Sequence, residues 1–428
     1  MANPLSRNLL RRSLIQISVA AALTMPGTAS LAAGPYDFSY LGQQIVPSGT
    51  QSLGTTIGGL SGIDYVAASG SSGFTTGSYI AISDDRSALS NVRFYSIGLN
   101  LSGFQRTSSA GSAAVSFNSV TTILTPGGSP FAINTVDPES IRLDSRSGTL
   151  IWTNEGQRSA SGFQNPTLRT MMPNGTHGMD FAVGNRYNPI GSVGGNTGGD
   201  SGIRNNLAFE SLTLSTSGQS VFIATENALA QDGPASTATN GTYSRVAEFD
   251  RSSGALTREF AYYVEPVQVS PNPATGFATN GLVERLAIDD TNFFMLERSF
   301  SSGIAGTGNT IKLYLASLDG ATDVFALSSL TGGGFSPMQK SLLLDLGTLQ
   351  NDDGSFLALD NVEGMTWGPT LASGKRSLIL VSDNNFSATQ FTQFVALEVA
   401  PVPEPEVWAM MSVGLLLSGF VARRRRIR

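Results

Sequence analysis

Short hydrophobic runs that end at an acidic residue recur along the chain. They are YIAIS before Asp84, LIWTN before Glu155, VFIAT before Glu226, FFML before Glu297 and LILVS before Asp383. The first four acids lie 71 residues apart, and the fifth follows after 86. A short apolar run rich in β-branched and aromatic residues is typical of a buried strand. The regular spacing predicts a repeated β-rich unit.

A second acidic residue stands ahead of most of these runs. It is followed by one variable residue and then by Ile, Leu or Met. The members are Glu139, Glu210, Glu284 and Glu363, and the first copy has Ser61 in this place. Their context predicts that they lie near the start of a strand, one strand ahead of the first series.

Two more strand-like runs follow in most repeats, separated by turn sequences such as RSSG and SLDG. Units of three or four strands predict an all-β fold, a β-propeller. We expect five or six blades, and seven if the long segments between the repeats contain further strands. A repeat of 71 residues is longer than a blade requires, and loops such as 184–202 would contain the additional residues. The last repeat lacks a strand, so we expect residues 37–46 to supply it and close the ring.

Equivalent positions of successive blades face one another around the axis of a propeller. Both series of acids are therefore expected to meet at the central channel or its mouth, where crowded carboxylates raise one another's pKa. A bound cation would remove this repulsion, and oxygen ligands without His or Cys favour Ca²⁺. The alternative is that the acids cap turns or accept backbone N–H groups between blades. Both roles remain open at this stage, and different members can have different roles.

Composition excludes several kinds of site. The chain has 428 residues, no cysteine and one histidine, His177. A disulfide framework, a thiol nucleophile and a His-rich or Cys-rich metal site are excluded. No G-x-S-x-G sequence is present, and a Ser/His/Asp triad would have to use His177, which lies in the turn-like PNGTHG. A serine esterase is therefore harder to support than a metal-dependent enzyme.

Both ends of the chain have the composition of sorting signals. Residues 1–32 combine three arginines, an apolar run and a small-residue stretch, as in a secretory signal peptide. Residues 401–428 contain Pro-Glu-Pro at 403–405, then a 16-residue apolar run and four consecutive arginines. This order resembles the PEP-CTERM sorting signal of Gram-negative bacteria. A plain C-terminal anchor is the alternative.

The sorting-signal resemblance implies a route for the protein. An exosortase-type enzyme would recognise the tail and remove it. The precursor would be anchored in the inner membrane, and the product would reach the periplasm, the outer surface or the exterior. The propeller domain would occupy residues 33–400.

The charge of this body is more negative than that of the whole chain. The chain carries −6, and residues 1–32 and 404–428 each carry +3, so the body carries −12. A body this acidic is a poor partner for nucleic acid and a good one for cations. We therefore expect no nucleic-acid partner.

Many short motifs resemble one bacterial family over residues 36–400. They are GGLSGIDY, YIAISDDRS, NNLAFESLTL, FIATENAL, ERLAIDD, LERSF, LDGATDV, VEGMTWGP and LILVSDNNF. This order of motifs is similar to the phytase-like family, described as "esterase-like activity of phytase". The resemblance implies an exported β-propeller with phosphomonoesterase or esterase activity. The family's polar positions fall on Asp84, Asp85, Arg86, Glu155, Asn205, Glu210, Glu226, Glu284, Arg285, Glu297, Arg298, Glu363, Asp383, Asn384 and Asn385.

Two functions are consistent with these residues. In a calcium-dependent phosphoric-ester hydrolase, the acids of both series would hold the metal. Arg86, Arg285 and Arg298 would then bind the phosphate as charge-assisted donors, although each has an acidic neighbour with which it could form a salt bridge instead. In a non-catalytic surface propeller, the same face would bind a polysaccharide, a protein or a small ligand. The sequence leaves open whether the protein is an enzyme.

Overall fold

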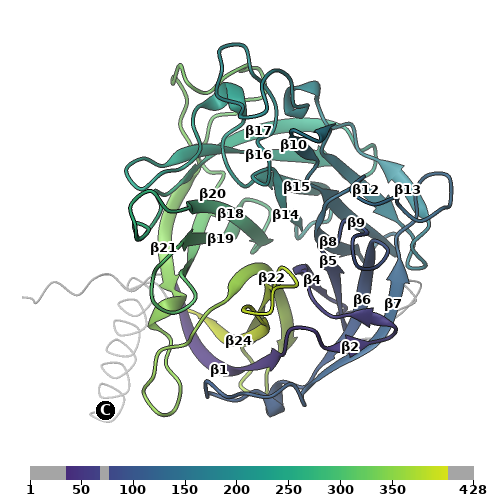
Figure 1. The fold of residues 1–428 in the computed structure, drawn as a ribbon, viewed down its shortest axis with the longest axis vertical. Helices are drawn as coiled ribbons and strands as arrows, with labels where there is room; N and C mark the ends of the chain where they lie inside the picture. The colour runs from purple at the N-terminus through teal and green to yellow at the C-terminus, as the bar shows by residue number, and fades with distance from the viewer. Residues whose placement is uncertain (1–34, 68–76, 403–428) are drawn as a thin grey trace, which may run out of the picture. The chain divides into compact units, whose positions relative to one another are not determined.

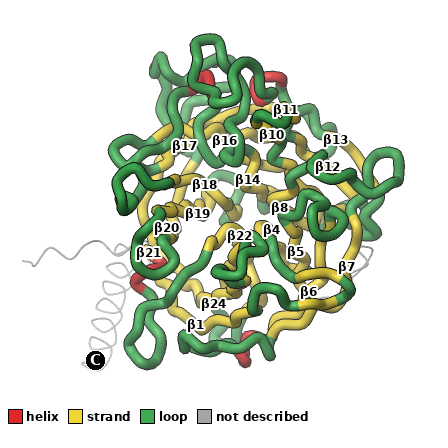
Figure 2. The backbone as a smooth tube through the Cα atoms, viewed as in Figure 1, coloured by secondary structure: helices red, strands yellow, loops and turns green. Residues whose placement is uncertain are grey.

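The computed structural model describes residues 35–67 and 77–402. The signal peptide expected over 1–32 and nearly all of the sorting segment expected over 401–428 lie outside these residues. Regular structure in the described part consists of strands and four short 3-10 helices (Figure 2). None of its helices is long and apolar enough to cross a membrane.

Twenty of the strands form five four-stranded antiparallel sheets, the blades (Figure 1). From the innermost strand outward they are: blade 1, β4 (Leu60–Tyr65), β5 (Tyr79–Ser83), β6 (Arg93–Leu99) and β7 (Val115–Thr122); blade 2, β8 (Pro138–Asp144), β9 (Thr149–Asn154), β12 (Thr167–Met171) and β13 (His177–Asp180); blade 3, β14 (Phe209–Leu214), β15 (Ser220–Thr225), β16 (Thr242–Asp250) and β17 (Leu256–Val264); blade 4, β18 (Ala278–Ala287), β19 (Asn292–Ser301), β20 (Asn309–Ser317) and β21 (Gln339–Asp345); and blade 5, β22 (Asn361–Thr370), β23 (Arg376–Asp383), β24 (Thr392–Pro401) and β1 (Tyr36–Val46).

The remaining elements are small. Two hairpins pair β2 (Gln51–Ser52) with β3 (Thr55–Thr56) and β10 (Gln157–Ser159) with β11 (Gly162–Gln164). The 3-10 helices are η1 (Leu101–Gly103), η2 (Asn185–Tyr187), η3 (Ala230–Asp232) and η4 (Leu346–Thr348). The long segments between repeats therefore contain loops and short turns rather than a sixth blade.

The five inner strands contact one another in sequence around a ring, β4 to β8, β14, β18, β22 and back to β4. Each pair of neighbouring blades encloses its own hydrophobic cluster, including the pair formed by blades 1 and 5. The apolar runs follow from this arrangement, because a middle strand such as β15 is covered on both faces and is almost wholly buried. The prediction of an all-β propeller is confirmed, with five blades.

The closing strand is β1. It pairs antiparallel with β24 from Tyr36–Pro401 to Val46–Thr392, with one bulge near Tyr40. Tyr40 is buried in the cluster between blades 4 and 5, and Val46 in the cluster between blades 5 and 1. The expectation that residues 37–46 complete the last blade is confirmed, and β1 thereby joins the start of the domain to its end.

One buried ion pair lies inside the ring of inner strands. Arg142 on β8 and Glu284 on β18 are 2.7 Å apart, and both side chains are almost fully buried. The Arg142 guanidinium donates to the backbone carbonyls of Ile63 at 2.7 Å, Met365 at 3.1 Å and Arg285 at 3.3 Å. These contacts join blade 2 to blades 1, 5 and 4.

Glu284 supplies the contact to the remaining blade. Its carboxylate accepts the backbone N–H of Leu212 on β14 at 3.2 Å and the Ser140 hydroxyl of β8 at 3.4 Å. The pair therefore bonds to the inner strands of all five blades. A buried pair of this kind is stable only when further hydrogen bonds satisfy the remaining donors and acceptors.

Small residues at the matching positions leave room for the Glu284 side chain. By strand register, Glu284 corresponds to Gly62, Ser140, Ser211 and Gly364 in the other blades. A Cβ atom on Gly62 would lie 2.7 Å from the Glu139 carbonyl oxygen of the next strand. The inner strands are therefore too close for a side chain at that position in blade 1.

Deleting residues 35–46 should expose β24 as an open edge and uncover the two clusters that β1 seals. We expect a loss of several kcal/mol, seen as a melting temperature lower by roughly 10 °C, together with aggregation. Calorimetry and light scattering measure both effects. An unchanged melting temperature would show that β1 does not hold the ring closed.

Replacing Arg142 by Met should leave the Glu284 carboxylate buried without its partner, at a cost of about 3–5 kcal/mol. The matched control is Arg258→Met, because Arg258 is half-exposed where it pairs with Glu248 at 2.7 Å. That exposed pair should contribute less than about 1 kcal/mol. Denaturant unfolding measures both variants, and equal losses would contradict the proposed importance of the channel pair.

Candidate metal centre

Each inner strand contains a bulge near its start. The register with the second strand shifts there by one residue in all five blades. A bulge re-aims a side chain, and bulges are common beside functional sites. The bulges lie at Ser61 in β4, Glu139 in β8, Glu210 in β14, Val283 in β18 and Glu363 in β22. Three of the five inner strands thus turn a carboxylate toward the same end of the channel.

The second strands bring a further set of side chains to this end. In each blade, the inner-strand residue just before the bulge pairs with a residue at the end of the second strand. These second-strand residues are Ser83, Asn154, Thr225, Glu297 and Ser382. The residues that follow these partners along the chain are Asp84, Glu155, Glu226, Arg298 and Asp383. Four of the five blades therefore contribute an acid here, and blade 4 contributes an arginine.

These two sets give seven carboxyl groups, and Asp137, just before β8, adds an eighth; we call the eight the acidic ring. They are Asp84, Asp137, Glu139, Glu155, Glu210, Glu226, Glu363 and Asp383. All are buried except Asp84, which is partly exposed. Partial exposure of Asp84 marks the side on which solvent reaches the ring.

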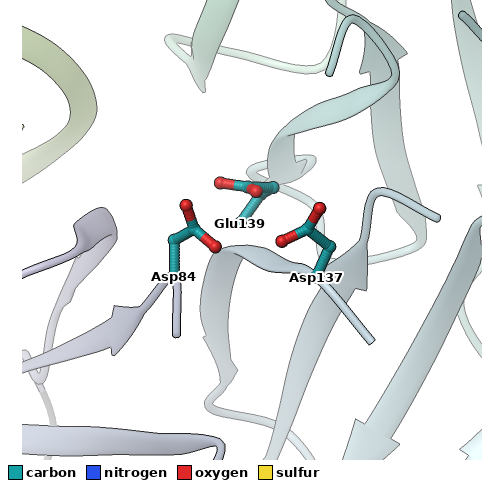
Figure 3. Close-up of side chains that lie close together, drawn as sticks. All are labelled: Asp84, Asp137 and Glu139. Atoms are coloured by element: carbon teal, nitrogen blue, oxygen red, sulfur yellow. The ribbon is translucent and has the colours of Figure 1, made fainter. Parts of the chain in front are cut away.

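The tightest group of the ring consists of Asp84, Asp137 and Glu139. One oxygen from each carboxylate lies within 4.8 Å of the others. Figure 3 shows the three carboxylates turned toward a common space, Asp84 from the end of β5 and the other two from the start of β8. Glu139 also lies within the same distance of Glu155 and Glu210, so it belongs to both groups.

The charge of the ring is reflected in its proton affinities. Burial is the main cause that raises the pKa of Asp84, Glu139, Glu155 and Glu210 well above the usual range, and repulsion from neighbouring carboxylates adds to it. A hydrogen bond joins the carboxyl groups of Asp84 and Asp137. Without a cation, the ring is therefore expected to retain protons near neutral pH.

Glu226 lies between blades 3 and 4. Its backbone N–H donates to the Ala208 carbonyl at 2.6 Å, and its side chain rests on Gly281 of β18. A Cβ atom on Gly281 would lie 2.1 Å from Glu226 Oε1, so this close approach requires glycine. Burial raises the pKa of Glu226 to about 7, although Arg298 opposes the shift.

Blade 4 departs from the sequence series by one residue. By strand register, the residue of blade 4 that is equivalent to Glu210 is Val283 rather than Glu284. The residue equivalent to Glu226 is Arg298 rather than Glu297. Successive side chains of a strand point to opposite faces, so a shift of one residue sends the side chain to the other face. The sequence led us to expect Glu284 and Glu297 in the ring, but the structure does not place them there.

Both displaced acids have partners elsewhere. Glu284 pairs with Arg142 in the channel, as described above. Glu297 accepts the Tyr262 hydroxyl at 2.9 Å and the Asn280 amide at 3.1 Å, and it pairs with Lys340. These contacts give both residues the structural role that the sequence left open as the alternative.

The three candidate substrate arginines have different surroundings. Arg298 lies 2.9 Å from Glu363 and 3.6 Å from Glu226, so it offsets the negative charge of this part of the ring. Arg285 is buried between the rings of Phe222 and Phe293, and this burial lowers its pKa to about 9. Arg285 lies away from the ring, in the apolar region between blades 3 and 4.

Arg86 is the arginine best placed to meet a substrate. Its side chain is 25% exposed and lies 2.9 Å from Asp137. Its second terminal nitrogen donates to Gln157, while its Nε has no hydrogen-bond partner among the described residues. Arg86 therefore combines a fixed position beside the tightest carboxylate group with partial exposure to solvent.

Sequence reasoning missed Asp137. It lies two residues before Glu139 in the motif DPESIRL. This closeness to a member of the second series was the signal that could have identified it. His177 lies at the start of β13, the outermost strand of blade 2, at 3.9 Å from Asp180. The histidine therefore takes no part in the ring.

The residues present fit a hard divalent cation. Ligand oxygens lie 2.3–2.6 Å from Ca²⁺, so two ligands of one ion are separated by at most about 5 Å. The separations within both carboxylate groups meet this limit. The ligand set consists of oxygen atoms alone, which suits Ca²⁺ or Mg²⁺ rather than softer metals.

The metal-free protein should lose stability as pH rises. For a carboxyl whose pKa is raised in the folded state, the folded protein binds more protons than the unfolded chain, so the free energy of unfolding falls with pH. For Glu226 the window runs from about 4.5 to about 7, and its full loss amounts to roughly 3 kcal/mol. Melting temperatures in chelator should therefore fall between about pH 5 and 8, and calcium should remove much of this dependence. A melting temperature that rises over this interval in chelator would contradict the assignment.

Comparison with known proteins gives a family and distant fold neighbours. No curated protein matches the chain. The structure is similar to that of an N-acetylgalactosamine deacetylase from F. plautii. The match covers 86% of this chain and 95% of the deacetylase chain, at 11% identity and a TM-score of 0.42. A periplasmic gluconolactonase of Pseudomonas aeruginosa covers 80% and 88%, at 10% identity and a TM-score of 0.32. Similarities this distant carry no argument about activity. The family described as "Phytase-like: Esterase-like activity of phytase" matches residues 55–386, about three quarters of the chain, and the protein belongs to this family.

Proposed function

We propose that this protein is a calcium-dependent hydrolase of phosphoric esters or related esters, with its reaction centre at the acidic ring. The observation that carries the proposal is the group Asp84, Asp137 and Glu139, whose oxygens lie within 4.8 Å of one another. Buried carboxylates this close repel one another unless a cation or protons intervene. Family membership supports the reaction class.

The ring carboxylates would hold the cation, with Glu139 shared between the two groups of ligands. Bound calcium supplies charge stabilisation for an ester oxygen and lowers the pKa of water. Ring carboxyl groups that do not contact the cation would take up or release a proton. Burial of the ring limits access of bulk water.

Arg86 would orient the substrate. Its partly exposed side chain and its place beside Asp137 suit a charge-assisted hydrogen bond to an anionic oxygen. Arg298 would instead keep the opposite part of the ring near neutral through Glu226 and Glu363. We therefore assign substrate binding to Arg86 and charge balance to Arg298.

We further propose that the protein is exported and processed. The support is the signal-like composition of residues 1–32 and the Pro-Glu-Pro, apolar and arginine segments after residue 402. An exosortase-type enzyme would be the processing partner. Mass spectrometry of the protein from its native host would show both cleaved ends, and retention of either intact end would contradict this proposal.

Turnover of p-nitrophenyl phosphate, phytate and p-nitrophenyl acetate, with calcium or with chelator, tests the hydrolase proposal. We expect activity that requires calcium and falls about 100-fold in Glu139→Gln. The control is Asp319→Asn, because Asp319 is exposed in a turn of blade 4, away from the ring. Calcium binding without turnover of any of these esters would favour the non-catalytic binding propeller. Activity that persists unchanged in chelator would contradict the metal.

A further inference from the structure

A cavity of about 840 Å³ opens beside the acidic ring, between blades 3, 4 and 5. Its buried lining residues include Glu226, Arg298 and Glu363, and Glu226 and Glu363 are also members of the ring. The cavity and the ring are thus two parts of one site.

The cavity wall is polar but mostly uncharged. Amide and hydroxyl side chains from loops and strand ends line it, among them Asn206, Thr279, Asn309, Asn361, Asn385 and Gln390. Amides both donate and accept hydrogen bonds, and hydroxyls do the same. A wall of this kind matches a ligand that also carries many groups able to donate and accept.

One side of the cavity presents an aromatic surface. The Phe277 side chain is 68% exposed, and its ring lies 6.1 Å from that of Phe300, which supports it from within the cavity lining. An exposed phenylalanine beside amides offers an apolar plane to the C–H face of a ligand ring.

The charges of the lining exclude two other classes of ligand. Among the described residues of the lining, Arg298 is the single cation and is already bound to Glu363, while Glu226 and Asp360 add further carboxylates. A ligand dense in phosphate would be repelled by this excess of negative charge. A purely apolar ligand would leave the amides without partners, which costs binding energy.

Glu226 offers a specific point of attachment. The residue is 1% exposed and lines the cavity. Its Oε1 atom has no hydrogen-bond partner among the described residues. The nearest cation, Arg298, is 3.6 Å away. A ligand hydroxyl that donates to this oxygen would satisfy it.

We propose that the cavity binds a neutral sugar residue, stacked on Phe277 and hydrogen-bonded to Glu226 and the surrounding amides. This proposal rests on the proposed function where it concerns the substrate, which is then an ester of a saccharide. The sugar occupies the cavity, and the ester group lies over the group of Asp84, Asp137 and Glu139. Binding of the sugar itself does not require the metal.

The test begins with a microarray of neutral hexose and N-acetylhexosamine oligosaccharides, probed with the purified protein in chelator. Calorimetry with the best-bound oligosaccharide then compares wild type, Phe277→Ala, Phe277→Trp and Phe356→Ala. We expect the affinity to fall at least tenfold in Phe277→Ala and to be retained in Phe277→Trp. Phe356→Ala is the matched control, because Phe356 is 63% exposed and lies outside the cavity lining.

Three results would overturn the sugar proposal: no oligosaccharide bound, an affinity that Phe277→Ala leaves unchanged, or tighter binding of phytate or a peptide at the same Phe277-dependent site. Circular dichroism of Phe277→Ala guards against misfolding, which is not expected for so exposed a residue. Sugar binding in chelator together with no calcium-dependent turnover would refute the hydrolase and leave the sugar site standing. Calcium-dependent turnover of phytate or p-nitrophenyl phosphate without sugar binding would do the reverse.

Discussion

The pairing of Arg142 with Glu284 inside the ring of inner strands holds five separate blades around one axis. Each blade packs only on its two neighbours through its own hydrophobic cluster. The ion pair bonds to backbone or side-chain groups of all five inner strands. These contacts pair the terminal nitrogens of Arg142 and the carboxylate of Glu284, although Arg142 Nε has no hydrogen-bond partner among the described residues. A buried pair that would otherwise be costly thereby becomes a common attachment point of the ring.

This attachment also fixes the site above it. The bulges at Glu139, Glu210 and Glu363 lie one position from the layer that contains Glu284 and its small counterparts. Close approach of the inner strands therefore forces their carboxylates together at the end of the channel. The cost of this crowding appears as raised pKa values throughout the acidic ring, and it provides the driving force for cation binding.

Blade 4 makes the ring asymmetric. Val283 and Arg298 replace the two acids that a symmetric propeller would carry there. Among the described residues, the carboxylates around Glu139 have one arginine nearby, Arg86 beside Asp137. Glu226 and Glu363 are instead paired with Arg298. One half of the site is thus suited to a metal, and the other half opens into a polar cavity with an aromatic wall.

The sequence alone determined the repeated β-units, the closing strand and most of the acidic ring, because strand periodicity and acid spacing are local properties of the chain. It also pointed to Glu284 and Glu297, since Glu297 follows Glu226 by 71 residues and the neighbours of both acids looked equivalent to those in the other repeats. Only the tertiary structure decided otherwise: a one-residue difference in register turns a strand side chain to the opposite face, and equal spacing does not reveal it. The partners of Arg142, the place of Asp137 in the ring and the cavity beside Phe277 all depend on strands distant in sequence, which come together only when the ring closes.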